Sequence, residues 1–346
     1  ALDVTDPDSP TLLWEIDQTT ESNLGFSFAK PVITKLNDGT WVVLFTSGYN
    51  NISPGDGKGY LYVRNAVTGA HIRRIATNVG STDNPSGLGK IASWADKPEK
   101  NNLTTFTYGG DLQGNLWRFD INAGTATRMA ILRDAAGAVQ PITARPELGA
   151  VSGRRIIFVG TGKYLELSDL EDAQTQTLYA IRDDLSAGTL DNPRTALVEQ
   201  TLTTTGATRK VSSNAIDLRR DRGWYIDFPD SGERVNVDIR LDSGTLIVPT
   251  TVPSATVCEP GGYGWLNYFN YLTGSVVPGA EDGLSGQRYN APIVGVNTYR
   301  LPNGKRIVTA VTANNPTPEK PPKGTGGDLP DAGFRGKRVI YREISP

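Results

Sequence analysis

Residues 108–120 read Tyr108-Gly109-Gly110-Asp111-Leu112-Gln113-Gly114-Asn115-Leu116-Trp117-Arg118-Phe119-Asp120, a glycine turn that leads into a short apolar strand. The chain repeats this pattern: a glycine is followed by leucine two positions later and by a second glycine ten positions later, starting at Gly59, Gly114 and Gly264. A weaker copy, Thr177–Ile181, has Gln176 in the first glycine position. Strand-sized units that recur every few tens of residues are typical of propellers and other arrays. The repeat therefore predicts a scaffold that displays loops.

Runs rich in Val, Ile, Thr and aromatic residues alternate with clusters of Gly, Pro, Asn and Asp, which indicates many short strands. The strands are predicted in pairs: Trp41–Tyr49 with Gly59–Gly69, Thr104–Asp111 with Gly114–Gly124, Arg154–Tyr164 with Gln176–Asp183, Gly244–Val252 with Gly264–Gly274, and Lys305–Asn314 with Gly336–Ile344. One four-stranded propeller blade takes roughly 40–50 residues, so the longer intervals here indicate loop insertions. We predict an all-β, modified β-propeller of four-stranded antiparallel blades, with about five blades visible and long irregular loop insertions.

Four further strands are predicted beside these pairs, at Lys30–Leu36, His71–Ala76, Arg128–Leu132 and Pro292–Tyr299. Leu12–Ile16 is similar to the last strand of an earlier blade, and Ser168–Thr177 is the one segment with a partial helical pattern. None of the loops reads as an interdomain linker. We predict a single β-propeller domain over residues 1–346.

The composition excludes several classes of function. The chain has 35 Lys and Arg against 37 Asp and Glu and no long basic stripe, which argues against nucleic acid as a partner. No apolar run approaches the roughly 20 residues that a transmembrane segment needs. The one cysteine, Cys258, excludes an internal disulfide and is either an inert thiol or bonded to a cysteine elsewhere. The one histidine, His71, is predicted to be a half-exposed strand residue.

Three segments are predicted to be surface loops that contact partners: Asn50–Lys58, Ala187–Asn214 and Asn314–Gly336. The candidate partner-binding residues on them are Asn50, Asn51, Asp56, Lys58, Asn192, Arg194, Lys320 and Lys323. Within the first loop, Gly55–Gly59 lacks the spacing of a phosphate-binding loop, so we interpret it as a hairpin turn.

No catalytic constellation is predicted, and a metal site is not expected. The nearest approach to a calcium loop is Asp96, Glu99 and Asn101, but Lys97 and Lys100 oppose a cation there. Leu61–Gly69 resembles a repeat found in quinone-dependent propeller dehydrogenases, which leaves such an enzyme as an alternative. Those enzymes need a cofactor cage with metal ligands, for which this sequence offers no paired carboxylate motif. We therefore predict a protein that is not an enzyme and has no cofactor, with calcium as the less favoured alternative.

Several motifs together resemble one family. They are Phe28–Val32, Ser47–Asn51 with Gly55–Val63, Gly109–Asp120, Gly160–Leu165 with Ser168–Leu170, Gly223–Asp227 and Pro260–Leu266. They are similar to the C-terminal β-propeller of the PilC/PilY family, the tip-associated adhesins and biogenesis factors of type IV pili. The resemblance runs from about Leu12 to Ile344, and Gly109–Asp120 is its most specific motif. It implies that the chain is a C-terminal fragment of a larger protein, without the N-terminal adhesive region and the first propeller strands.

The resemblance implies an exported protein at the pilus tip or outer membrane that supports pilus assembly, opposes retraction and mediates adhesion to surfaces or host cells. Its implied partners are minor pilins at the pilus tip, the N-terminal region of the same protein and a ligand on a host or abiotic surface. Many family members carry a calcium loop directly before the strand that matches Thr107–Asp111, and the residues there depart from it. Besides the quinone-dependent dehydrogenase, a second alternative is an outer-membrane scaffold propeller without a role in pili.

Overall fold

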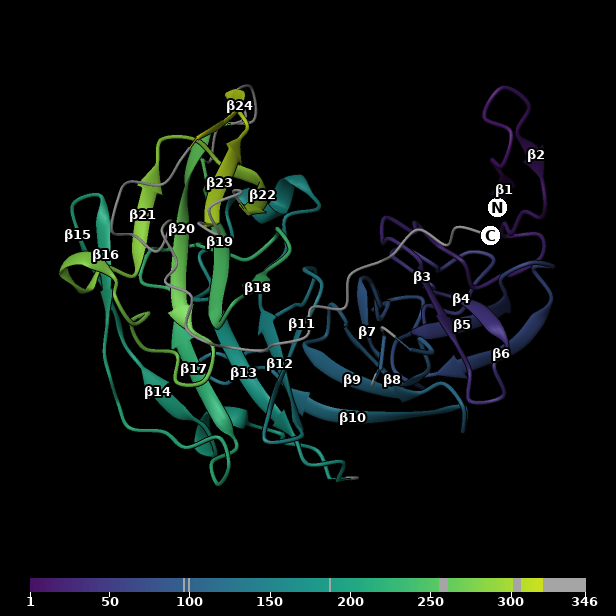
Figure 1. Ribbon diagram of the computed structural model, residues 1–346, viewed down its shortest axis with the longest axis horizontal. Coiled ribbons are helices and arrows are strands. Elements are labelled where there is room, and N and C mark those ends of the chain that lie inside the picture. The colour runs from purple at the N-terminus through teal and green to yellow at the C-terminus, as the bar shows by residue number, and fades with distance from the viewer. Residues whose placement is uncertain (96, 99, 187, 255–260, 301–305, 320–346) are drawn as a thin grey trace. The chain divides into compact units, whose positions relative to one another are not determined.

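The computed structural model describes residues 1–95, 97–98, 100–186, 188–254, 261–300 and 306–319 (Figure 1). Within these residues the regular structure is all β apart from short 3-10 helices, which confirms the predicted fold class. Contacts between residues divide the chain into two compact units. Among the described residues, unit 1 comprises residues 1–129 and 188–189, and unit 2 comprises residues 130–186 and those from 190 onward. Whether both belong to a single domain, as the sequence predicts, stays a prediction.

The first part of the chain forms two four-stranded sheets in which neighbours in sequence are neighbours in space. The first sheet contains β3 (Val32–Lys35), β4 (Trp41–Thr46), β5 (Tyr60–Asn65) and β6 (His71–Ala76). The second contains β7 (Ile91–Ala95), β8 (Thr104–Gly110), β9 (Asn115–Asp120) and β10 (Thr125–Ile131). The pairs β3–β4, β4–β5, β5–β6, β7–β8 and β8–β9 are antiparallel, as expected for propeller blades. Before them, β1 (Leu2–Asp3) pairs with β2 (Thr11–Leu12).

A buried carboxylate explains why the Gly109–Asp120 motif makes a tight turn between β8 and β9. Asp111 Oδ1 accepts the backbone N–H groups of Gln113 at 3.0 Å and Asn115 at 2.9 Å, and Oδ2 accepts Trp117 Nε1 at 2.9 Å. Gly114 has φ +74°, which a residue with a side chain rarely adopts. Burial raises the pKa of the Asp111 carboxyl, while the Trp117 and Asn115 donors lower it. The motif is therefore a structural turn, closed by one satisfied carboxylate.

Two larger sheets follow in unit 2. The five-stranded sheet has the order β11 (Glu147–Val151), β12 (Arg154–Gly160), β13 (Thr177–Asp183), β17 (Gly223–Asp227), β14 (Val198–Gln200). The six-stranded sheet has the order β15 (Leu202–Thr205), β16 (Thr208–Val211), β21 (Gly286–Tyr289), β20 (Gly262–Asn270), β19 (Thr245–Pro253), β18 (Arg240–Asp242). The five-stranded sheet contains a parallel pair, β14 with β17, and the other sheet has six strands. Both sheets therefore depart from the simple four-stranded antiparallel blade.

The last described sheet has three strands, β22 (Ile293–Arg300), β23 (Arg306–Thr312) and β24 (Asn315–Glu319). The predicted loop Asn314–Gly336 thus begins with a strand. Pro316 and Pro318 indicated a loop because proline lacks an N–H, but an edge strand such as β24 tolerates that loss. The remainder of that loop and the predicted strand Gly336–Ile344 lie outside the described residues.

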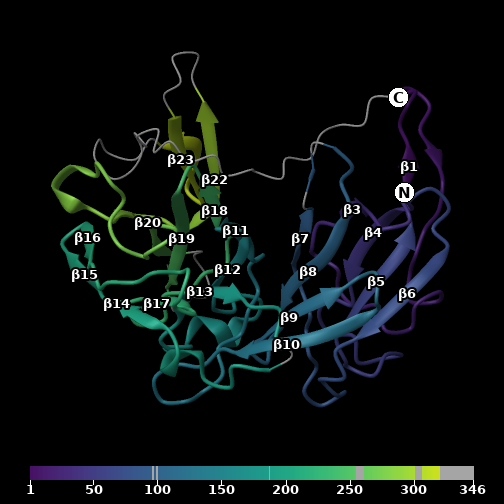
Figure 2. The same cartoon turned by 60° about the horizontal axis from the view of Figure 1, so that its bottom comes forward.

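Two other predicted segments differ in the structure. The Ser168–Thr177 segment contains only one turn of 3-10 helix, η1 (Leu167–Leu170). The Ala187–Asn214 segment, predicted to be a loop, contains η2 (Pro193–Thr195), β14, β15 and β16 (Figure 2). A third 3-10 turn, η3, spans Glu281–Gly283. Threonine has a high strand propensity, which accounts for the strands β15 and β16 in a segment that lacks apolar alternation.

Each unit buries an apolar cluster of its own. The cluster in unit 1 is built from alternate residues of β4 and β5 together with β9 residues, including Val42, Leu61 and Phe119. A cluster in unit 2 is built around Phe158, Trp224 and other residues of the five- and six-stranded sheets. Burial of such side chains contributes roughly 25 cal/mol per Å² of apolar surface removed from water. These sheets hold the connecting segments from which a partner site must be built.

Candidate partner-binding surface

The first predicted loop, Asn50–Lys58, is tied down from inside. Asn51 is buried, and its Nδ2 donates to the carbonyl oxygens of Asn23 at 3.2 Å and Lys58 at 2.8 Å. Asp56 Oδ2 accepts the Tyr60 hydroxyl at 2.7 Å, and burial together with this hydrogen bond raises the pKa of Tyr60 to about 12. Asn50 is exposed, whereas Asp56 and Lys58 are half-exposed and form an ion pair at 3.6 Å. Asn51 shapes the loop; the others can reach a partner.

In the second predicted loop, the side chain of Arg194 is already occupied. Its guanidinium forms a two-pronged ion pair with Asp227, with Nη1 at 2.8 Å from Oδ1, and lies 4.4 Å from the ring centre of Tyr225. The ion pair with Asp227 raises the pKa of Arg194. Asn192 is exposed, and its side chain accepts the backbone N–H of Arg194 at 3.2 Å. Both residues hold η2 against β17, and their predicted role in binding stays a prediction.

A buried ion pair fixes the β15–β16 hairpin to its sheet. The Arg209 guanidinium, on β16, donates to both Glu233 oxygens at 2.7 Å and lies 3.8 Å from the ring centre of Trp265. Arg209 and Glu233 are both fully buried. Burial raises the pKa of Glu233, and the Arg209 guanidinium lowers it. The hairpin is thus a fixed part of the sheet, at its margin in Figures 1 and 2.

The remaining predicted site residues provide little structural evidence for a binding site. Asp96 and Glu99 of the degenerate calcium loop, Lys320 and Lys323 of the third loop, and Cys258 lie outside the described residues. Asn101 is exposed, and its Oδ1 accepts the Leu103 N–H at 3.3 Å. In the part of the chain that the structure describes, no group of three or more His, Cys, Asp or Glu side chains is placed to hold a metal ion.

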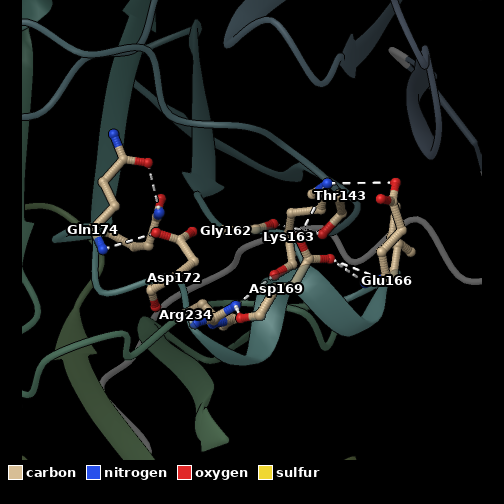
Figure 3. Close-up of polar contacts among 10 residues, drawn as sticks. Thr143, Gly162, Lys163, Glu166, Asp169, Asp172, Gln174 and Arg234 are labelled. Atoms are coloured by element: carbon tan, nitrogen blue, oxygen red, sulfur yellow. Dashed lines mark hydrogen bonds and ion pairs between the residues drawn. The ribbon is translucent and has the colours of Figure 1, made fainter. Parts of the chain in front are cut away.

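A surface segment held by many internal hydrogen bonds, which the sequence predictions did not select as a site, is Lys163–Asp172, here called the clamped loop (Figure 3). It connects β12 to β13 and contains η1. Asp169 is buried; its Oδ2 accepts the N–H groups of Leu165 at 2.7 Å and Glu166 at 2.9 Å. Its Oδ1 lies 3.0 Å from Lys163 Nζ. Burial raises the pKa of Asp169, but the Leu165, Glu166 and Lys163 donors together lower it by more, so its net pKa shift is downward. The loop is organised around one ionised carboxylate.

Arg234 holds the clamped loop from below (Figure 3). It is almost completely buried, and its guanidinium donates to the carbonyl oxygens of Lys163 at 2.8 Å, Asp169 at 2.6 Å and Asp172 at 2.7 Å, and of Gly232 at 2.8 Å. Burial lowers the pKa of Arg234. Four carbonyl acceptors satisfy the buried cation without a direct hydrogen bond to a carboxylate. Arg234 thereby fixes the backbone of a surface loop from both of its ends.

Two glycines allow this close packing. A Cβ on Gly162 would lie 2.4 Å from Arg234 Cβ, and one on Gly232 would lie 2.7 Å from the Asp172 carbonyl oxygen. Gly162 has φ +130° and Gly232 has φ +69°. The Gly160–Leu165 motif was a clue to this site, but its arginine comes from about 70 residues later in the sequence. Sequence spacing alone gave no signal for Arg234.

Comparison with known proteins gives a consistent result. The family described as the PilY1 beta-propeller domain matches residues 1–130 and 126–215. The type IV pilus biogenesis factor PilY1 of Pseudomonas aeruginosa is 32% identical over 327 residues, covering 79% of this chain and 28% of that protein. A PilY1 homolog of Xylella fastidiosa is 33% identical over 370 residues, covering 99% of this chain and 28% of that protein. The chain thus spans little more than a quarter of the length of these relatives.

A solved structure extends the match to the fold. The crystal structure of the Pseudomonas aeruginosa PilY1 C-terminal domain is similar with a TM-score of 0.74 and 26% sequence identity. The match covers 89% of this chain and 75% of that one. Among the described residues, no helix is long and apolar enough to cross a membrane.

Proposed function

Because the chain belongs to the family of the PilY1 β-propeller domain, we propose that it is the propeller part of a protein that acts in type IV pilus biogenesis. The observation that carries this proposal is the joint match to PilY1 proteins in sequence and to the PilY1 C-terminal domain in structure. The chain covers only 28% of those relatives, so the activity of the whole protein is part of the proposal.

We further propose that the protein works at the pilus tip or outer membrane after export, where it supports assembly, opposes retraction and mediates adhesion. Its proposed partners are minor pilins, the N-terminal region of the same protein and a surface ligand. A sheet scaffold suits this role, because backbone hydrogen bonds between strands hold the connecting segments in fixed positions. Among the predicted residues, Asn50, Asp56 and Lys58 are accessible enough to take part.

The test is a deletion of the gene, with surface pili and attached cells counted while the retraction motor is intact and again when it is absent. Loss of pili that returns when the motor is removed supports a role against retraction. Loss in both backgrounds supports a role in assembly, and normal pili with lost attachment support adhesion alone. Unchanged pili and attachment would contradict the proposal.

We propose a role without catalysis, and the quinone-dependent dehydrogenase is the alternative to test against it. The purified protein would be incubated with the quinone, calcium and an electron-accepting dye, together with candidate alcohols. No reduction of the dye above a control without protein is expected. Substrate-dependent reduction would contradict the non-enzymatic proposal.

A further inference from the structure

The clamped loop presents two large apolar side chains to solvent. Leu165 is 44% exposed and Leu167 is 70% exposed, and Glu166 between them has 66% of its side chain exposed. A single exposed leucine is ordinary on a protein surface. Two on one short loop, separated by one residue, form a small apolar tip whose burial against another surface is favourable.

The backbone beneath this tip is ordered before any partner arrives. Arg234 donates to three carbonyl oxygens of the loop, and Asp169 accepts two of its N–H groups. Moving a guanidinium out of water is costly, and the hydrogen bonds of Arg234 largely offset that cost. The main effect of Arg234 is therefore to fix the backbone of the clamped loop in one conformation. A loop that is already rigid loses little conformational entropy on binding, which increases affinity without any new contact.

The charges around the tip select its partner. Lys163 Nζ lies 3.0 Å from Asp169 and 3.5 Å from Glu166, so two carboxylates share this one cation. Glu171, which is exposed, adds a third carboxylate, and the surroundings of Leu165 and Leu167 are therefore acidic overall. An anionic lipid surface would be repelled by these carboxylates. A protein surface with an apolar pocket and Lys or Arg side chains at its rim would match both the leucines and the glutamates, because complementary potentials favour docking.

We infer that the clamped loop is a docking element that inserts Leu165 and Leu167 into an apolar pocket of a partner protein, with basic residues around that pocket. The inference rests on the proposed function, since a pilus biogenesis protein acts through contacts with other proteins. It names the contact surface and the chemistry of its partner, neither of which the family assignment supplies.

The test uses the full-length protein in living cells, with the photoreactive residue p-benzoylphenylalanine in place of Leu167. The matched control carries the same residue in place of Val294, an apolar side chain of the same unit that is 57% exposed. Irradiation is expected to give a covalent adduct with another protein from position 167 and not from position 294. Mass spectrometry should place the attachment site in an apolar pocket beside Lys or Arg residues.

A second variant tests the charge argument independently of the probe's size. The substitution Glu171→Lys, which leaves the clamp contacts of Glu166 intact, is expected to lower the adduct yield from position 167 by about twofold or more, because a rim attraction becomes a repulsion. An unchanged yield would overturn the basic rim. Equal yields from positions 167 and 294, an adduct with lipid, or an adduct with a second copy of this protein would overturn the docking element.

Failure of the inference can be separated from failure of the proposed function. The same strain is compared with the deletion strain for its number of surface pili. If deletion leaves pili and attachment unchanged, the proposed function is wrong whatever the adducts show. If pili depend on the gene and position 167 still gives no specific adduct, the docking inference alone is wrong.

Discussion

At the scale of single residues, Arg234 is one side chain that donates to three carbonyl oxygens of the clamped loop. The Arg234→Ala variant removes the donor that four buried or part-buried carbonyl oxygens share. We expect it to lower the free energy of unfolding by about 3 kcal/mol or more, because unpartnered buried acceptors are costly. Chemical denaturation measures this loss, and limited proteolysis should show faster cleavage between Leu165 and Glu171.

Arg234→Lys is the conservative control for this change. Lysine keeps the charge but places three donors on one atom and cannot reproduce the planar fork that reaches both ends of the loop. We expect an intermediate loss of stability and intermediate cleavage. A denaturation midpoint equal to that of the unaltered protein for Arg234→Ala would show that the clamp contributes nothing.

Asp169 gives the clamped loop a dependence on pH. Its pKa in the folded protein is lowered, so its contribution to stability is fully present above the unfolded pKa of about 3.9 and is lost as the pH falls through the lower folded value. Asp169→Asn should therefore cost about 1–3 kcal/mol at pH 7. The difference from the unaltered protein should shrink below about pH 4. The measurement is denaturant unfolding of both proteins at pH 7 and pH 3, and a constant difference would refute this role for the charge.

At the scale of elements, the β15–β16 hairpin depends on the buried Arg209–Glu233 pair. Arg209→Met leaves the Glu233 carboxylate buried without its cation, which we expect to cost about 3–5 kcal/mol. The double variant Arg209→Met with Glu233→Met removes the two fully buried charges and should cost much less. Asp230, the other carboxylate beside Arg209, keeps its hydrogen bonds from Tyr263 and Trp265. Denaturant unfolding of the single and double variants measures the coupling. If the double variant were as unstable as the sum of the single changes, the pair would not act as a unit.

The sequence predicts elements well where local pattern and structure agree. The His71–Ala76 strand matches β6, and the Gly109–Asp120 motif predicts a turn that Asp111 closes from within four residues. The sequence predicts elements poorly where residues far away in the chain determine the local structure. β16 was missed because Arg209 is a polar residue whose burial requires Glu233, 24 positions later. The clamped loop was missed as a site because its order comes from Arg234, which lies 62 to 71 positions from its acceptors in the loop.

At the scale of the whole molecule, the two units bury separate apolar clusters, and this predicts where a core defect spreads. Leu61 is fully buried in the unit 1 cluster, so Leu61→Ala should cost about 2–5 kcal/mol. Because the unit 1 and unit 2 clusters share no residue, we expect hydrogen exchange to accelerate in β3–β6 while β19 and β20 stay protected.

The matched substitution in unit 2 is Leu246→Ala, since Leu246 is equally buried in the other cluster. It should give the reverse pattern, with faster exchange in β19 and β20 and little change in β3–β6. Equal acceleration throughout the chain in both variants would instead mean that the units unfold together, as the sequence prediction of one domain over residues 1–346 requires. Exchange measured strand by strand therefore decides whether the described propeller sheets form one cooperative structure or two.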